Sequence, residues 1–154
     1  MRKLTLFGLV AVGAIGVSAP ALAGGPPDTF TDTQHNVTET IPFEGPCAGG
    51  PGMVTITSNS VFHVTQFEDG RFHVSGNQTG KFSFDPDDPA LGNSTGSFTN
   101  GFNDTGNSNV FNSTSNFSAR GRTEDGEMLR FHVTSHITIV GSDVIVQFDN
   151  VSCG

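Results

Sequence analysis

The sequence predicts an all-β protein, an antiparallel meander of seven or eight strands that forms a closed or nearly closed barrel, with a β-sandwich as the alternative. Three observations lead to this prediction. After the first 23 residues, apolar and polar residues alternate over long stretches, and no helical periodicity is present. The triplet Glu-Asp-Gly stands twice between such stretches, which is typical of hairpin turns. Two cysteines far apart in the chain could hold a curved sheet closed.

The clearest strands are residues 53–67 and 71–84, which flank the first Glu-Asp-Gly triplet. A three-residue loop with Gly70 in the left-handed conformation would pair Phe67 with Arg71. A two-residue turn would shift the register by one and place the apolar residues of the two strands on opposite faces. The longer loop is therefore expected. It puts the following side chains on one buried face: Phe62, Val64, Phe72 and Val74.

The same rule applied to the second triplet pairs Thr123 with Glu127. Phe117 and Ala119 then share the buried face of Leu129, Phe131 and Val133. Gly141-Ser142 fits a two-residue type II′ turn, which places Ile137 and Ile139 beside Val144 and Val146. Weaker strands are expected at residues 33–41, 94–102 and 108–120, and loops are expected at residues 48–52 and 85–92, where Gly and Pro gather.

The first residues have the pattern of a secretory signal peptide. Arg2 and Lys3 precede an apolar stretch at residues 4–17, and an A-x-A motif ends at Ala23. We expect cleavage after Ala23, a flexible lead-in at residues 24–30 and a single domain at residues 31–154. The mature protein is therefore expected to be soluble and secreted to the extracellular space, with no membrane span.

Cysteine count and charge narrow the class of protein further. Cys47 and Cys153 are expected to form a disulfide, because an exported chain with an even number of cysteines is oxidised. Without Arg2 and Lys3, five basic residues remain against fifteen acidic ones. This acidic balance disfavours nucleic acid and anionic membranes as partners. Fourteen Phe residues, with no Trp or Tyr, must supply the aromatic packing.

The triplet Phe-His-Val occurs three times and could mark a metal site. Its histidines are His63, His73 and His132, and the expected register turns all three away from the apolar face. His63 and His73 are weak metal candidates, because they would be diagonal neighbours at about 7–8 Å between α-carbons. No third ligand is placed beside them, so no metal and no other cofactor is expected. The simpler interpretation is a strand segment with Phe and Val inward and His outward.

Other motifs carry no chemistry in this context. The G-x-S-x-G match at residues 92–96 lacks the strand-to-helix turn of a nucleophile elbow, so no catalytic residue is assigned. Asp85, Asp87 and Asp88 lack the spacing of a calcium loop. Seven N-x-S/T sequons follow from strands rich in Asn, Ser and Thr.

One feature suggests a ligand pocket. Midway along the strands, the inward positions carry small or polar side chains where a packed core would carry large ones. Such residues could line a cavity, although Phe side chains from facing strands or bulges at the glycines would also explain them. The proposed pocket residues are Ser58, Ser60, Gln78, Ser115 and Ser135.

Several segments of the chain are similar to a known group of proteins. "FHVT", "EDGRFHVSGNQTGKFSFDPDDP", "LRFHVTSH" and "VQFDNVSC" resemble segments of small secreted proteins of unknown function found in actinobacteria and other environmental bacteria. The resemblance covers most of the mature chain and implies secretion and a β-rich fold. It supplies no catalytic residues.

These observations favour an exported β-barrel protein that holds a small apolar or amphipathic ligand. Two alternatives stay open at this point, a secreted surface or interaction protein without an interior pocket, and a barrel enzyme of the cyclase type. The oligomeric state and the identity of any ligand do not follow from the sequence.

Overall fold

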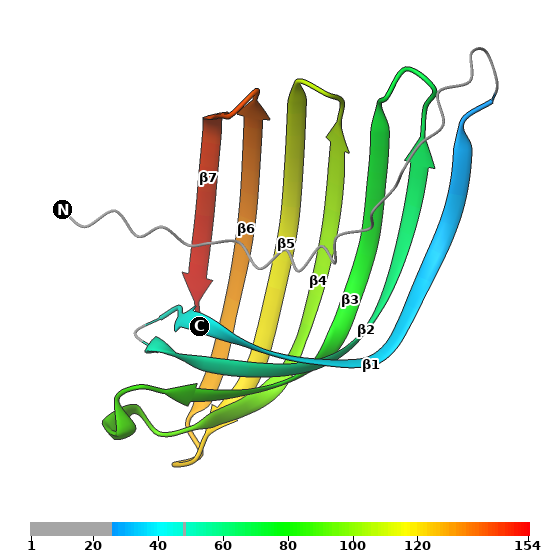
Figure 1. Ribbon diagram of the computed structural model, residues 1–154. Helices are drawn as coiled ribbons and strands as arrows, with labels where there is room; N and C mark the ends of the chain where they lie inside the picture. The colour runs from blue at the N-terminus through cyan, green and yellow to red at the C-terminus, as the bar shows by residue number, and fades with distance from the viewer. Residues whose placement is uncertain (1–25, 48) are drawn as a thin grey trace.

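The computed structural model describes residues 26–47 and 49–154. The expected signal peptide lies outside these residues. Seven strands form one antiparallel sheet in sequence order, which confirms the all-β meander (Figure 1). The first strand begins at Asp28, so the last residues of the expected lead-in belong to it. The elements are β1 (Asp28–Gly45), β2 (Gly50–Gln66), β3 (Phe72–Pro86), the short 3-10 helix η1 (Pro89–Leu91), β4 (Ser94–Gly106), β5 (Val110–Thr123), β6 (Met128–Val140) and β7 (Asp143–Cys153).

Both Glu-Asp-Gly turns have the expected three-residue form. The backbone N–H of Phe67 donates to the carbonyl of Arg71 at 2.9 Å, and that of Thr123 donates to Glu127 at 3.0 Å. Gly70 and Gly126 have φ values of 81° and 85°, in the region that glycine adopts without steric cost. The registers of β2 with β3 and of β5 with β6 follow from these turns.

The third turn is confirmed, but the strand after it contains a bulge. Ile139 pairs with Val144 as expected, and then the register shifts, so that Thr138 pairs with Val146. Val146 therefore lies on the face opposite Ile137, and the prediction that these two side chains share a face is wrong. The extra residue in β7 is Ile145, which stands in a run of apolar residues without alternation, so the sequence pattern contained no sign of it.

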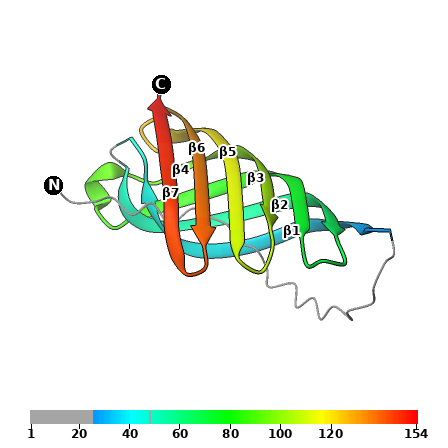
Figure 2. The same cartoon turned by 90° about the horizontal axis from the view of Figure 1, so that it is seen from above.

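The sheet curls strongly but is not closed by hydrogen bonds. In the described part of the chain, each strand pairs only with its sequence neighbours, and no ladder joins β7 to β1. Seen from above, β1, β2 and β3 cross β5, β6 and β7 at a steep angle (Figure 2). The expected disulfide between Cys47 and Cys153 is present, with 5.9 Å between the α-carbons, and it joins the loop after β1 to the end of β7.

Glycines on the concave face lie under phenylalanine rings of neighbouring strands. A β-carbon built on Gly96 would lie 2.6 Å from the ring of Phe82, its cross-strand partner. A β-carbon on Gly106 would lie 2.8 Å from the ring of Phe72, which is again the paired residue. Because glycine has no side chain, each ring can lie flat across the neighbouring strand, an arrangement that suits a strongly curved sheet.

Two ends of the sheet differ in burial. The closed end, beside the disulfide, holds the main apolar core, which consists of Val54, Ile56, Phe82, Phe84, Phe98, Ala119 and Phe131. At the open end, near the turns at residues 67–71 and 141–142, Phe62, Phe72 and Val74 are only half-buried. Among the residues expected on a buried face, Val64, Ala119 and Phe131 are buried. Phe117, Leu129 and Val133 are half-buried. Within residues 26–47 and 49–154, no second layer covers the concave face at the open end.

Candidate functional site

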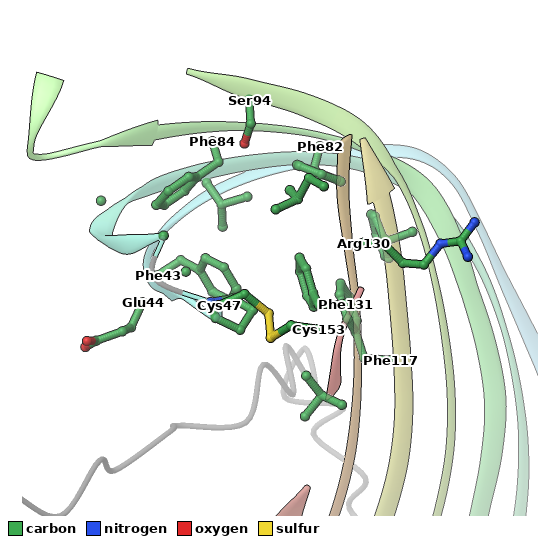
Figure 3. Close-up of a pocket in the computed structure, with 18 of the residues that line it drawn as sticks. Phe43, Glu44, Cys47, Phe82, Phe84, Ser94, Phe117, Arg130, Phe131 and Cys153 are labelled. Atoms are coloured by element: carbon green, nitrogen blue, oxygen red, sulfur yellow. A yellow bond between two sulfur atoms is a disulfide. The ribbon is translucent and has the colours of Figure 1, made fainter. Parts of the chain in front are cut away.

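A cavity of about 940 Å³ lies at the closed end of the sheet. Its wall is mostly aromatic and aliphatic, and β1, β2, β3, β4, β5 and β6 all contribute to it. The disulfide borders it on one side (Figure 3). The principal apolar lining residues are Phe43, Val54, Ile56, Phe82, Phe84, Phe98, Phe117, Leu129 and Phe131.

The aromatic wall is held by contacts among its own rings. Phe43 meets Phe84 edge to face at 5.8 Å between ring centroids, while Phe117 stacks on Phe98 at 5.4 Å and on Phe131 at 5.7 Å. Such pairs fix the ring orientations. No side chain in the described part of the chain is less than 2% exposed. The same rings border the cavity, so this part of the core lines an open space on one side.

The part of the cavity toward the middle of the sheet is polar. Ser115 and Ser135 are cross-strand partners, and their Oγ atoms lie 2.9 Å apart. Asn100 also lines the cavity, and its side-chain oxygen is buried without a hydrogen-bond partner. An unpaired buried acceptor is costly for the fold, so a donor supplied by a ligand would relieve that cost.

Charged residues at the cavity are mainly acidic. Four carboxylates line it, whereas Arg130 is the one cation among the described lining residues. Figure 3 shows the side chains of Arg130 and Glu44 pointing away from the aromatic rings. An anionic ligand would therefore meet net negative charge with no opposing cation inside the cavity. The carboxylates are Glu44, Asp87, Glu127 and Asp149.

The five pocket residues expected from the sequence fall into two groups. Ser115 and Ser135 line the cavity. Ser58, Ser60 and Gln78 share its concave face but do not line it: Gln78 Nε2 donates to Ser58 Oγ at 2.9 Å, and Ser60 Oγ contacts the side-chain oxygen of Gln34 at 3.5 Å. Sequence reasoning missed the aromatic wall and Asn100. The inward Phe positions were visible, but alternation does not tell a ring that lines a space from one that fills it.

The two weak metal candidates do not form part of a larger cluster. His63 pairs with Ser75 and His73 with Thr65 across β2 and β3, and His63 Nδ1 lies 3.0 Å from the hydroxyl of Thr31. No group of three or more His, Cys, Asp or Glu side chains that could hold a metal ion is found within the described residues.

The histidines of β6 belong to a repeated hydrogen-bond network on the convex face. Thr134 Oγ1 donates to Asn116 Oδ1 at 3.0 Å and lies 3.2 Å from His132 Nε2. Because the single hydroxyl proton goes to the Asn oxygen, Nε2 must carry the imidazole proton. Nδ1 of His132 then accepts from Ser118 Oγ at 2.7 Å. The same network recurs four residues on, with Thr114, His136, Thr138 and Asn112.

A buried carboxylate lies on the concave face outside the cavity. Asp104 is 5% exposed, and one of its oxygens has no hydrogen-bond partner. Burial raises the pKa of Asp104 above 3.8, while a hydrogen bond with Ser113 and the charge of His73 act in the opposite direction. We therefore expect the stability of the fold to depend on the protonation of Asp104.

Comparison with other proteins does not place the chain in a family. No family model matches it, and no curated protein or solved structure is significantly similar to it. In the described part of the chain, no helix has the length and apolar character needed to cross a membrane. The cavity geometry is therefore the basis for a functional conclusion.

Proposed function

We propose that the protein is a binding module that holds a small, largely apolar molecule in the cavity at the closed end. The observation that carries this proposal is the cavity itself, about 940 Å³ of space lined mainly by aromatic and aliphatic side chains. Ligand sites of proteins usually measure roughly 300–1,000 Å³, are mostly apolar and contain a few polar anchors. All three properties fit this cavity.

The polar groups narrow the class of ligand. The unpaired oxygen of Asn100 calls for a hydrogen-bond donor, such as a hydroxyl or an amide N–H, on one end of the ligand. The acidic lining disfavours an anion. The ligand is therefore a neutral or cationic molecule with an apolar body and a donor group.

The site of action in this proposal is outside the cell. The signal-peptide pattern that ends at Ala23 supports export. The bond between Cys47 and Cys153 also supports it, because disulfides persist mainly in oxidising compartments.

The proposal is tested by titrating the mature protein with N-phenylnaphthylamine, a neutral apolar fluorescent probe. We expect one saturable site and a melting temperature that rises with probe concentration, because a ligand of the native state stabilises it. Ser135→Phe places a ring inside the cavity, beside Ser115, and should weaken binding strongly. Thr134→Phe adds the same ring on the convex face of the same strand and should leave binding unchanged.

Circular dichroism establishes that each variant is folded, and Ser115→Phe replaces Ser135→Phe if the latter does not fold. Equal probe affinity in the folded cavity variant and in the convex-face variant would contradict the proposal. Failure of the native protein to bind any neutral aromatic probe would also contradict it, and would favour the alternative of a surface interaction protein.

The donor requirement has its own test, in which naphthol and naphthalene compete with the probe. Naphthol should bind more tightly than naphthalene by about two- to tenfold, the worth of one net hydrogen bond. Asn100→Leu should remove that difference without abolishing naphthalene binding. A difference that persists in this variant would show that Asn100 is not the anchor.

A further inference from the structure

Strand β7 presents an exposed apolar edge. Every residue from Asp143 to Cys153 is exposed, and β7 pairs only with β6, so the backbone groups on its other side have no strand partner in the described structure. Apolar side chains stand on both faces of this strand: Ile145 is 61% exposed and Phe148 is 50% exposed. An edge of this kind is a template for pairing with another strand.

The opposite edge strand, β1, has features that prevent pairing with another strand, and β7 lacks most of them. β1 contains Pro42, has a register shift between Gln34 and Val37, and carries four acidic residues with no Lys or Arg. Proline, bulges and charge are the features that block edge pairing in natural sheets. β7 has no proline and carries only two acidic residues, Asp143 and Asp149. Its one bulge lies next to the turn, which leaves the segment 146–153 regular.

We propose that β7 pairs antiparallel with β7 of a second copy of this chain, so that two sheets become one continuous sheet. A strand partner is required because the free groups are backbone N–H and C=O. β1 of another copy is disfavoured by its proline and by its acidic residues, which would face Asp143 and Asp149. Pairing of β7 with itself has two-fold symmetry and closes after two copies.

The charges and the backbone pattern fix the register. Gly154 N–H donates to the carbonyl of Arg130, and antiparallel hydrogen bonds alternate along a strand. The N–H groups of Gln147, Asp149 and Val151 therefore point toward the free edge. A two-fold axis at Phe148 places Gln147 opposite Asp149 of the second copy. The side-chain amide of Gln147, a hydrogen-bond donor, then faces the carboxylate of Asp149. The two Phe148 rings then meet on the convex face.

The dimer is tested by sedimentation equilibrium on the mature protein. We expect a monomer–dimer equilibrium. Phe148→Lys places two ammonium groups face to face at the axis and should raise the dissociation constant by about tenfold or more. Val61→Lys is the control, because Val61 is an exposed apolar residue on the convex face of β2, within the sheet. It should leave the equilibrium unchanged.

A cross-link tests the register. Phe148→Cys should form a disulfide-linked dimer under mild oxidation, because residues facing each other at such a position lie about 4.5 Å apart, within reach of a disulfide. Val61→Cys should not. A monomer at every concentration, an equal response to Phe148→Lys and Val61→Lys, or growth into open-ended assemblies would each overturn the proposal. These outcomes do not depend on ligand binding in the cavity.

Discussion

The closed and open ends are made of the same seven strands with the same alternating pattern, yet they bury their side chains to different degrees. At the closed end the curled sheet faces itself, and Phe131 is 6% exposed. At the open end no other described strand lies opposite the same concave face, and Phe72 stays half-buried. Alternation therefore decides which face a residue occupies, and the curvature of the sheet decides whether that face is buried.

The disulfide is expected to make the largest single contribution at the closed end. Replacing both Cys47 and Cys153 by Ser should lower the free energy of unfolding by about 4–5 kcal/mol, because the bond spans 106 residues and restricts the unfolded chain. Urea denaturation of the variant and the native protein measures this loss. An unchanged urea midpoint would show that the disulfide does not stabilise the curled sheet.

A pair of matched truncations compares the ends directly. Phe131→Ala removes a buried ring and should cost about 3–5 kcal/mol. Phe72→Ala removes a half-buried ring at the open end and should cost about 1–2 kcal/mol, in proportion to the smaller area withdrawn from water. Equal losses in denaturant unfolding would contradict the distinction between the two ends.

Two glycines of β4 test the link between curvature and burial. Gly96→Ala places a methyl group against the ring of Phe82 and the neighbouring backbone, and should cost about 1–3 kcal/mol. Gly101→Ala adds the same methyl on the convex face, where the nearest atom is 3.3 Å away and belongs to the Asn77 side chain. It should change stability by less than about 0.5 kcal/mol. Thermal unfolding of both variants measures the two changes in stability, and equal losses would contradict the link between curvature and burial.

The smallest expected effect on stability comes from Asp104, and this effect depends on pH. Because burial raises its pKa, the folded state holds the Asp104 proton more tightly than the unfolded chain does. Its contribution to stability is therefore fully present below the unfolded value of 3.8 and is lost as pH rises through the raised folded value. At pH values above the pKa of Asp104 in the folded state, the Asp104→Asn variant should be more stable than the native protein.

Melting temperatures of Asp104→Asn and the native protein across acidic pH test this expectation, and Asp125→Asn controls for the loss of one negative charge. A stability difference that does not change with pH would show that Asp104 titrates alike in the folded and unfolded chains.

The sequence was sufficient to predict the strands and their registers wherever a turn contained glycine at the position that needs left-handed geometry. Gly70 and Gly126 are examples, since each one sets the pairing of two long strands. The bulge at Ile145 was missed because an apolar run has no alternation to break. The sequence left open whether β7 pairs with β1, since both a nearly closed barrel and a sandwich were expected as possible folds. Closure depends on the total curl of the sheet and not on any one hairpin.

The cavity, too, could be predicted from the sequence only in part. Ser115 and Ser135 were identified because small inward residues stood out among large ones. Asn100 was missed because it lies in a strand rich in polar residues and does not differ from its neighbours. Its unpaired side-chain oxygen is nevertheless the most specific feature of the site. Which of the small residues border empty space depends on how far the sheet bends, and alternation within one strand does not determine that bend.

The order of the strands has a consequence for how the chain folds. Every described ladder joins sequence neighbours, so each hairpin can form on the one before it, and most of the structure requires only short loops to close. The bond between Cys47 and Cys153 is the exception, because it connects the two ends of the meander. In the native structure its sulfurs meet only because the sheet is curled, so we expect this bond to form after the hairpins.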